Sequence, residues 1–114
     1  MSEGLSGQRI DTFESHRFTK AFGRLPLSQQ VIVEDEIERI QDDPRLGELK
    51  KGDLSYLRVH KFPLEKQQAL LGYCWREEKI ELYLLSLDSH ENFYQDHKNH
   101  RKGDLKMMKW MSMK

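Results

Sequence analysis

Three stretches in the second half of the chain decide its fold: Leu54–Phe62 (LSYLRVHKF), Gln68–Arg76 (QALLGYCWR) and Ile80–Leu87 (IELYLLSL). All three are rich in leucine, aromatic or β-branched residues, and polar and apolar side chains alternate along the first. Only short connections, Pro63–Lys66 and Glu77–Lys79, separate them. Because tight connections join antiparallel neighbours, the three stretches predict an antiparallel meander.

Two helices are predicted upstream of the meander. Apolar side chains recur every three or four residues between positions 18 and 25 and again between 33 and 40, which is the spacing of one helix face. Pro26 separates the two segments, and Pro44 ends the second because the residue before a proline avoids helical geometry. Residues 8–14 alternate polar and apolar side chains and predict a short strand before this hairpin.

This order of elements predicts a single α+β domain over residues 1–100. We expect a small antiparallel sheet, formed by the N-terminal strand plus the three-stranded C-terminal meander, covered on one face by the α-helical hairpin. A C-terminal helix is expected near residues 89–100, and the second face of the sheet is expected to be open. Residues 101–114 form a basic, Met/Lys-rich C-terminal tail, which we expect to be flexible until it binds a partner.

Composition narrows the class of protein. The chain has 114 residues, of which 33% are charged, and its formal net charge is zero. The single cysteine, Cys74, excludes an internal disulfide and a cysteine-rich zinc module, and we expect it to be a buried structural residue. No charged-then-apolar leader opens the chain, and the longest apolar run is far shorter than the ~20 residues of a membrane span. We therefore expect a cytoplasmic protein with no membrane partner.

The net charge conceals an asymmetry between the two parts of the chain. Residues 1–44 carry 5 basic and 9 acidic side chains, whereas residues 45–114 carry 14 and 10. A polyanion would therefore meet the C-terminal part, although charge segregation of this size is also common without such a partner.

Motifs along the chain carry a resemblance to a known family. They run from about residue 9 to residue 98 and include a lysine- and glycine-rich turn, a basic strand and a His-Glu-Asn-Phe-Tyr ending: Asp43-Pro44, Gly47-Glu48, Lys50-Lys51-Gly52-Asp53-Leu54, Arg58-Val59-His60-Lys61-Phe62, Leu70-Leu71-Gly72-Tyr73 and Ser89-His90-Glu91-Asn92-Phe93-Tyr94. In this order, they resemble the RelE/ParE superfamily of type II toxin–antitoxin toxins.

The resemblance implies a small α+β toxin that a cognate antitoxin protein holds inactive. Many members similar to RelE cut messenger RNA on the ribosome without a metal ion, whereas ParE-like members inhibit DNA gyrase without cutting RNA. The fold alone does not choose between these outcomes. We take the RelE-like endoribonuclease as the leading hypothesis. A gyrase inhibitor, or a degenerate member that only binds antitoxin, is the alternative.

Metal-free RNA cleavage needs a base for the ribose 2′-hydroxyl, an acid for the leaving 5′-oxygen and cations for the phosphorane. His90 is the leading acid/base candidate because imidazole titrates near neutral pH and the family's ending places a histidine here. Tyr94, four residues later, is the candidate for stacking on a base. A turn or capping role for His90, and a sheet-edge packing role for Tyr94, are the structural alternatives.

Cationic side chains complete the predicted site. Arg58 and His60 are two residues apart on one strand, so they project from the same side, away from Leu57 and Val59. We expect both in an open groove, Arg58 holding the scissile phosphate and His60 as a second acid/base group. An ordinary solvated sheet face is the alternative. The predicted phosphate-binding residues are Lys50, Lys51, Lys61 and Arg76.

One departure from the family concerns the last strand. RelE-like nucleases commonly carry an arginine there, but residues 84–88 of this chain contain no cation and end in Asp88. Asp88 would repel a phosphate unless it orients His90, and Arg76 is the candidate to replace the missing cation. We assign no metal and no cofactor, because the His97-x-x-His100 spacing alone is a weak signal. The antitoxin is expected to be acidic where it covers the Arg58/His60 face or displaces the C-terminal segment.

Overall fold

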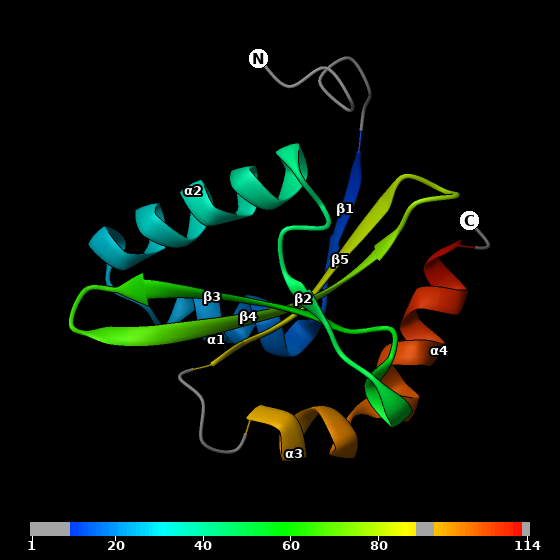
Figure 1. Cartoon of the computed structure of the whole chain (residues 1–114). Coiled ribbons are helices and arrows are strands. Elements are labelled where there is room, and N and C mark those ends of the chain that lie inside the picture. The colour runs from blue at the N-terminus through cyan, green and yellow to red at the C-terminus, as the bar shows by residue number, and fades with distance from the viewer. Residues whose placement is uncertain (1–9, 89–92, 113–114) are drawn as a thin grey trace.

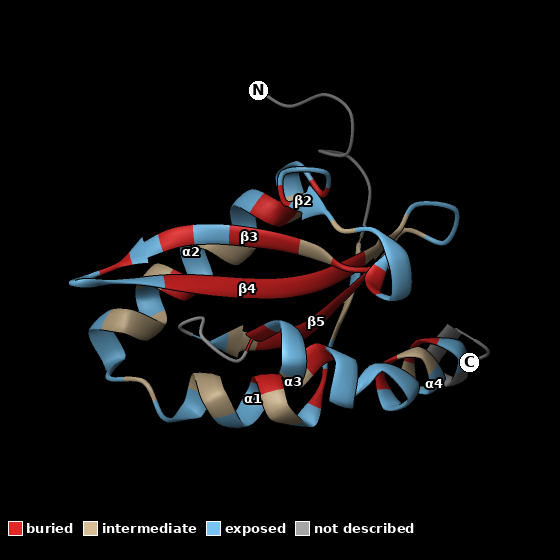
Figure 2. Cartoon of the chain, turned by 60° about the horizontal axis from the view of Figure 1, so that its bottom comes forward, coloured by how far each residue is buried: buried red, intermediate tan, exposed pale blue. Residues whose placement is uncertain are grey.

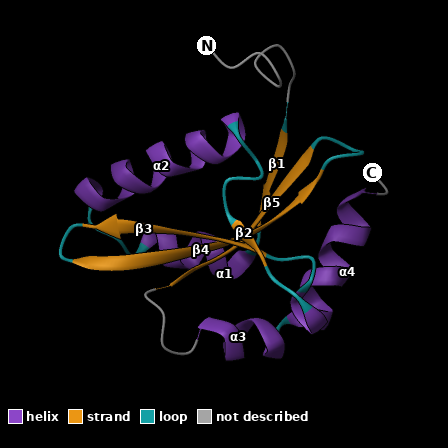
Figure 3. Ribbon diagram, viewed as in Figure 1, coloured by secondary structure: helices purple, strands orange, loops and turns teal. Residues whose placement is uncertain are grey.

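The computed structural model describes residues 10–88 and 93–112, which form a five-stranded sheet between two pairs of helices (Figure 1). The strands are β1 (Asp11–Glu14), β2 (Glu48–Leu49), β3 (Arg58–Leu64), β4 (Gln67–Arg76) and β5 (Glu81–Asp88). The helices are α1 (His16–Gly23), α2 (Leu27–Asp42), a 3-10 turn η1 (Gly52–Leu54), α3 (Phe93–Asn99) and α4 (Arg101–Ser112) (Figure 3). None of the helices in this described part combines the length and apolar character that crossing a membrane requires.

The sheet has the strand order β1-β5-β4-β3-β2. The predicted meander is confirmed, since β3 pairs antiparallel with β4 and β4 antiparallel with β5. In contrast to the expected all-antiparallel sheet, β1 pairs parallel with β5, and the two-residue strand β2 extends the opposite edge. No tight turn joins β1 to β5, because most of the chain lies between them. Local sequence patterns therefore do not indicate whether the two strands run parallel or antiparallel.

The helical hairpin covers one face of the sheet, as predicted. Ser15 caps α1: its Oγ accepts a hydrogen bond from the Phe18 backbone N–H at 3.0 Å and donates to the Leu85 carbonyl at 2.7 Å. The hydrophobic cluster beneath the hairpin joins α1 and α2 to alternate residues of the central strands: Phe18, Val33, Ile40, Phe62, Leu64, Ala69, Leu71, Tyr73, Leu82 and Leu84. This cluster forms the larger part of the core.

The second face of the sheet is also covered, which corrects the expectation of an open face. A second cluster joins this face to η1, α3 and α4: Leu54, Leu57, Val59, Leu70, Cys74, Tyr83, Leu85, Phe93 and Met108. Figure 2 accordingly shows β4 buried along most of its length. Each central strand presents apolar side chains on both sides, so exposing either face would leave a large apolar surface in water.

The basic C-terminal segment, which we expected to be flexible, is instead helical over residues 101–112. Met108 of α4 is 4% exposed and Asp104 is also 4% exposed, so this helix packs into the second cluster. Because no partner is needed for this packing, α4 is part of the folded domain. Figure 1 shows α4 beside the β4–β5 hairpin, away from α2.

Candidate nucleic-acid interface

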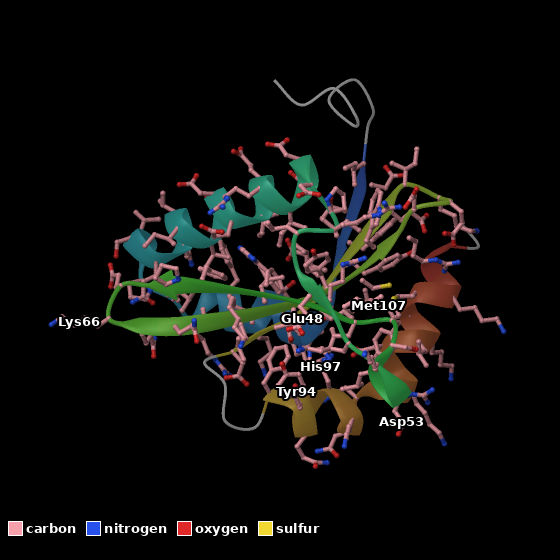
Figure 4. All side chains as sticks on the ribbon, in the orientation of Figure 1. Glu48, Asp53, Lys66, Tyr94, His97 and Met107 are labelled. Carbon is pink, nitrogen blue, oxygen red and sulfur yellow. The ribbon has the colours of Figure 1, made fainter. Side chains whose placement is uncertain are left out.

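The predicted residues Lys50 and Tyr94 come together where β2 approaches α3. The Lys50 ammonium nitrogen lies 5.2 Å from the centroid of the Tyr94 ring, which is a cation–π distance. Tyr94 lies in the first turn of α3 and is 38% exposed, whereas its neighbour Phe93 is buried. The Tyr94 ring is therefore partly exposed to solvent beside a cation. Figure 4 shows Tyr94 and His97 on α3, with Glu48 above them.

The ammonium group of Lys50 also contacts a carboxylate, that of Glu48. Lys50 Nζ donates to Glu48 Oε1 at 3.0 Å. Desolvation lowers the pKa of Lys50, but its interactions with Glu48 and Tyr94 outweigh that effect and raise it above its ordinary value. The same hydrogen bond, with the charge of Lys50 and a contribution from Lys61, lowers the pKa of Glu48. Lys50 is therefore cationic at neutral pH, although Glu48 offsets part of the local positive potential.

Lys61 extends the cationic surface along β3. It is exposed, and it projects from the same face of the strand as Val59, which packs toward α3 and α4. Lys51 is exposed immediately before η1. Lys50 and Lys61 thus lie on the side of the molecule that bears α3, and phosphate binding by these two residues and Lys51 stays a prediction.

His60 lies on the other face, which corrects the expectation that it projects into an open groove. It is 9% exposed beneath α2, and its Nε2 lies 2.6 Å from Glu36 Oε1. Its ring also stacks on Phe62 with centroids 5.5 Å apart. The pair is a packing contact between β3 and α2. His60 and Val59 do lie on opposite sides of β3, as predicted, but the side that carries His60 is the one that the helical hairpin covers.

Arg58 shares that face and is half-buried at the edge of the sheet. Its Nη1 donates to the Gly47 carbonyl at 2.8 Å and, at 3.4 Å, to the Arg45 carbonyl. These contacts hold the segment that joins α2 to β2. The structure therefore places Arg58 and His60 on one side, as expected, but separates both from Lys61 and from α3 by the thickness of the sheet. Among the described residues, Arg58 lines a surface cleft that His60 does not reach, so the expected groove shared by the two is not present there.

Sequence reasoning missed a buried polar network that joins four elements. His97 of α3 is fully buried, and its Nε2 lies 2.5 Å from Ser86 Oγ on β5. Its Nδ1 lies 3.7 Å from Asp104 Oδ2 on α4 and 3.4 Å from Arg17 Nη2 on α1. A polar residue at a strand position between leucines was the only signal of this network in the sequence.

Arg17 completes the network. Its two terminal nitrogens donate to the two oxygens of Asp104 at 2.7 and 3.0 Å, and its Nε donates to Asp96 Oδ2 at 3.2 Å. Desolvation raises the pKa of Asp104, but its interactions with His97 and with the Arg17 guanidinium outweigh that effect and lower the pKa. The network fixes α3 and α4 against α1 and β5, and hence the position of Tyr94.

Gly72 makes room for this arrangement. A Cβ atom at Gly72 would lie 2.7 Å from His97 Nε2, 2.7 Å from Ser86 Oγ and 3.0 Å from Phe93 Cζ. No side chain fits there without displacing α3. The Leu70-Leu71-Gly72-Tyr73 motif therefore has a packing role beneath the helix.

A family model matches residues 12–98, the greater part of the chain. It describes the ParE-like toxin of type II bacterial toxin–antitoxin systems. The chain belongs to this toxin family. Together with the α+β fold and the five-stranded sheet, the match confirms the predicted membership of the RelE/ParE superfamily and the toxin class. No curated relative matches the sequence.

Solved structures confirm the fold of the toxin. The toxin–antitoxin complex RelBE of E. coli matches with a TM-score of 0.60 at 17% identity, covering 73% of this chain and 99% of that one. The isolated E. coli RelE toxin matches with a TM-score of 0.58 at 15% identity, over 81% and 98%. An E. coli RelE double arginine-to-alanine variant bound to an antitoxin RelB peptide also matches, with a TM-score of 0.58 at 17% identity, over 76% and 92%. At such identities the likeness is one of fold.

The last strand of the toxin has no cation among residues 84–88, and its Ser86 belongs to the buried network. Arg76 does not replace the missing cation: it pairs with Glu81 in the register of β4 and β5, whereas Asp88 pairs with Leu70. Glu81 and Asp88 are at opposite ends of β5, about 24 Å apart at the usual rise of a strand, so Arg76 is far from Asp88. Arg76 instead pairs with Glu78 in the β4–β5 turn, at 3.2 Å.

The remaining predicted residues have different outcomes. His90 lies outside the described residues, and its role stays a prediction. Asp88 is exposed at the end of β5, in a shallow cleft between α1 and α3 that also contains Arg17, Arg24 and Asp96. Within the described ranges, no group of three or more histidine, cysteine or acidic residues is arranged to hold a metal ion. Cys74 is buried as predicted, and desolvation raises the pKa of its thiol to about 11.

Proposed function

We propose that this toxin is an endoribonuclease that cleaves ribosome-bound messenger RNA in the cytoplasm and so inhibits translation, with an antitoxin protein as its natural inhibitor. The observation that carries the proposal is the pairing of Lys50 with the exposed ring of Tyr94. RNA is read through splayed bases that stack on aromatic side chains next to backbone cations. Lys50 and Tyr94 provide one group of each kind, and Lys61 adds a second cation on the same side of the sheet.

The chemistry follows from the roles of these side chains. The ribose 2′-oxygen loses its proton to a base and attacks the adjacent phosphorus, and the 5′-oxygen leaves after taking a proton from an acid. The products are a 2′,3′-cyclic phosphate and a 5′-hydroxyl end. We assign one of the two proton transfers to His90, charge stabilisation to Lys50 and Lys61, and base stacking to Tyr94. We assign no step to His60, which contacts Glu36 of α2, or to Arg58, which donates to the Gly47 carbonyl before β2, because both lie across the sheet from Tyr94.

Purified toxin added to a reconstituted translation system tests the proposal. Cleavage is mapped by primer extension on the messenger RNA, and DNA gyrase supercoiling is measured in parallel. We expect cuts in ribosome-bound messenger RNA and unchanged supercoiling. His90→Ala should slow cleavage by about 100-fold or more, the usual range for removing a general acid or base. His16→Ala is the matched control, because His16 is exposed on α1, and it should cleave normally.

Three results would contradict the proposal. Inhibition of supercoiling with intact messenger RNA would show a gyrase inhibitor. Absence of both effects, with growth unaffected on overexpression, would show a member that only binds antitoxin. Full cleavage by the His90→Ala protein would remove His90 from the mechanism.

A further inference from the structure

The outward face of α4 carries three lysines to which the described part of the domain gives no ionic partner. Lys102, Lys106 and Lys109 follow one another at i, i+4 and i+7, so they lie within about 60° of one another around the helix axis. All three are exposed, and among the described residues none of them lies within ion-pair distance of a carboxylate. The stripe is therefore an uncompensated row of positive charge.

The opposite face of α4 fixes this stripe in place. Met108 packs against the sheet, and its carbonyl accepts a hydrogen bond from the Tyr83 hydroxyl at 3.4 Å. Asp104, the only acidic residue of the helix, is buried and engaged by Arg17. The only carboxylate on α4 thus faces inward, while the lysines face outward. The helix presents a cationic surface whose orientation relative to the sheet is held by the core.

The stripe lies outside the part of the chain that the toxin family shares. The family match ends at residue 98, and α4 begins at Arg101. Arg101 contributes to anchoring the helix, because its Nε donates to the Asp53 carbonyl at 2.7 Å. The charge on α4 is therefore a feature of this chain in addition to the family fold.

We propose that the Lys102–Lys106–Lys109 stripe is a second RNA-binding surface, which contacts the phosphate backbone without reading sequence. The proposal rests on the proposed function in taking RNA as the polyanion. Lysine ammonium groups act as point charges toward phosphates, and they need no fixed geometry to do so. The stripe contains no arginine fork and no exposed aromatic ring among its described side chains, so it lacks the groups that read bases.

An acidic protein segment is a poorer match to this surface. Protein partners gain most of their affinity from apolar or aromatic anchors in pockets. The apolar residues described on α4 pack into the second hydrophobic cluster: Leu105, Met107 and Met108. Among the described side chains of α4, the lysines therefore have no adjacent apolar anchor, which suits a nucleic-acid backbone.

The charge of the whole molecule would orient it on RNA. The exposed acidic residues of α2 lie on a different side of the molecule from α4 (Figure 1): Glu34, Asp35, Glu38 and Asp42. Such a separation steers the positive side toward a polyanion and keeps the negative side away. On RNA, α4 would add affinity beside Lys50 and Tyr94 without entering the cleavage chemistry.

Binding to a single-stranded 2′-O-methyl RNA, measured by fluorescence anisotropy over a series of salt concentrations, tests the inference. This probe lacks the 2′-hydroxyl nucleophile, so binding is measured independently of cleavage. The triple variant K102Q/K106Q/K109Q should bind roughly 10- to 50-fold more weakly near physiological salt. The slope of log K against log salt should fall by about 2, from three phosphate contacts at about 0.7 each. The charge-reversed triple K102E/K106E/K109E should bind more weakly still.

K20Q/R39Q/K66Q is the matched control, because it removes three exposed cations from α1, α2 and the β3–β4 turn. It should retain most of the affinity. Unchanged affinity and slope in the α4 triple variant, or an equal loss in the control, overturn the inference. Binding to polyglutamate is measured on the same proteins. If the α4 triple variant binds RNA normally but loses binding to polyglutamate, the inference is also overturned, and the stripe is assigned to an acidic protein partner. If the ribonuclease proposal alone fails, wild-type protein leaves messenger RNA uncut in the translation system but still binds the probe through α4.

Discussion

Arg17 of α1 donates two hydrogen bonds, of 2.7 and 3.0 Å, to the carboxylate of Asp104 on α4. The two residues are 87 positions apart in the sequence. Asp104 is 4% exposed and the Arg17 side chain 21%, so the pair is largely shielded from solvent. Removing one member of a buried pair leaves the other charge uncompensated, which is costly. This contact makes the C-terminal helix a structural part of the toxin.

Asp104→Ala should lower the free energy of unfolding by about 3 kcal/mol, measured by urea denaturation. Glu77→Ala is the control, because it removes an exposed ion pair with Arg45 and should cost less than about 1 kcal/mol. An equal decrease in the free energy of unfolding in the two variants would show that the Arg17–Asp104 contact stabilises the fold no more than an exposed ion pair does.

The same carboxylate predicts the acid sensitivity of the toxin. Folding lowers the pKa of Asp104 below its ordinary value of 3.8. Its contribution to stability is therefore complete above that value, and it is lost as pH falls through the lower pKa of the folded state. We expect the stability difference between wild type and Asp104→Asn to be constant near neutral pH and to shrink below about pH 4, in urea titrations at several pH values. A difference that instead grew as the pH fell would contradict the lowered pKa.

His60 and Lys61 are adjacent in sequence, but replacing them should affect different properties: stability for His60 and RNA binding for Lys61. His60→Ala leaves the partly buried Glu36 carboxylate with only the long contacts from Arg39, so it should cost about 1–3 kcal/mol in stability. Cleavage per folded molecule should be unchanged. Lys61→Ala should keep the stability and weaken RNA binding. Urea denaturation and cleavage assays on both proteins separate these effects, and reduced cleavage by folded His60→Ala protein would return His60 to the site.

Gly72→Ala should destabilise the toxin by about 1–3 kcal/mol, because the new methyl group would overlap His97, Ser86 and Phe93. Gly103→Ala is the matched control. No atom lies within 4 Å of a Cβ at Gly103, and alanine favours the helix, so this change should stabilise α4 by up to about 1 kcal/mol. Thermal unfolding measures both, and a neutral Gly72→Ala change would show that α3 shifts freely on the sheet.

Tyr94→Ala should weaken RNA binding by about 1–3 kcal/mol if one base stacks on the ring, whereas Tyr94→Phe should keep the stacking. Binding to the uncleavable RNA probe measures the effect. Leu27→Ala serves as the control, since Leu27 is 76% exposed on α2 and distant in sequence from the site. Wild-type affinity in Tyr94→Ala would exclude stacking on this ring.

Local sequence patterns were sufficient for the family and for most of the secondary structure, but they did not predict β2 or α4. Alternation and tight connections predicted β3, β4 and β5, and helical periodicity predicted α1 and α2, because these signals arise within a few consecutive residues. The ordered motifs from the lysine-rich turn to Phe93-Tyr94 identified the toxin superfamily. They also selected Lys50 and Tyr94, which lie together in the structure.

Tertiary structure alone decided which side of the sheet each residue meets. The alternation of β3 separates His60 from Val59, but both sides of the central strands are apolar, so the pattern does not say which side the helical hairpin covers. The partners of Ser86, His97 and Arg17 are likewise set by packing of elements far apart in the chain. The sequence by itself determined the central strands, the helical hairpin, their order and the family, because those depend on neighbours along the chain. The roles of Arg58, His60 and α4 depend on neighbours in space, and only the folded arrangement supplies those.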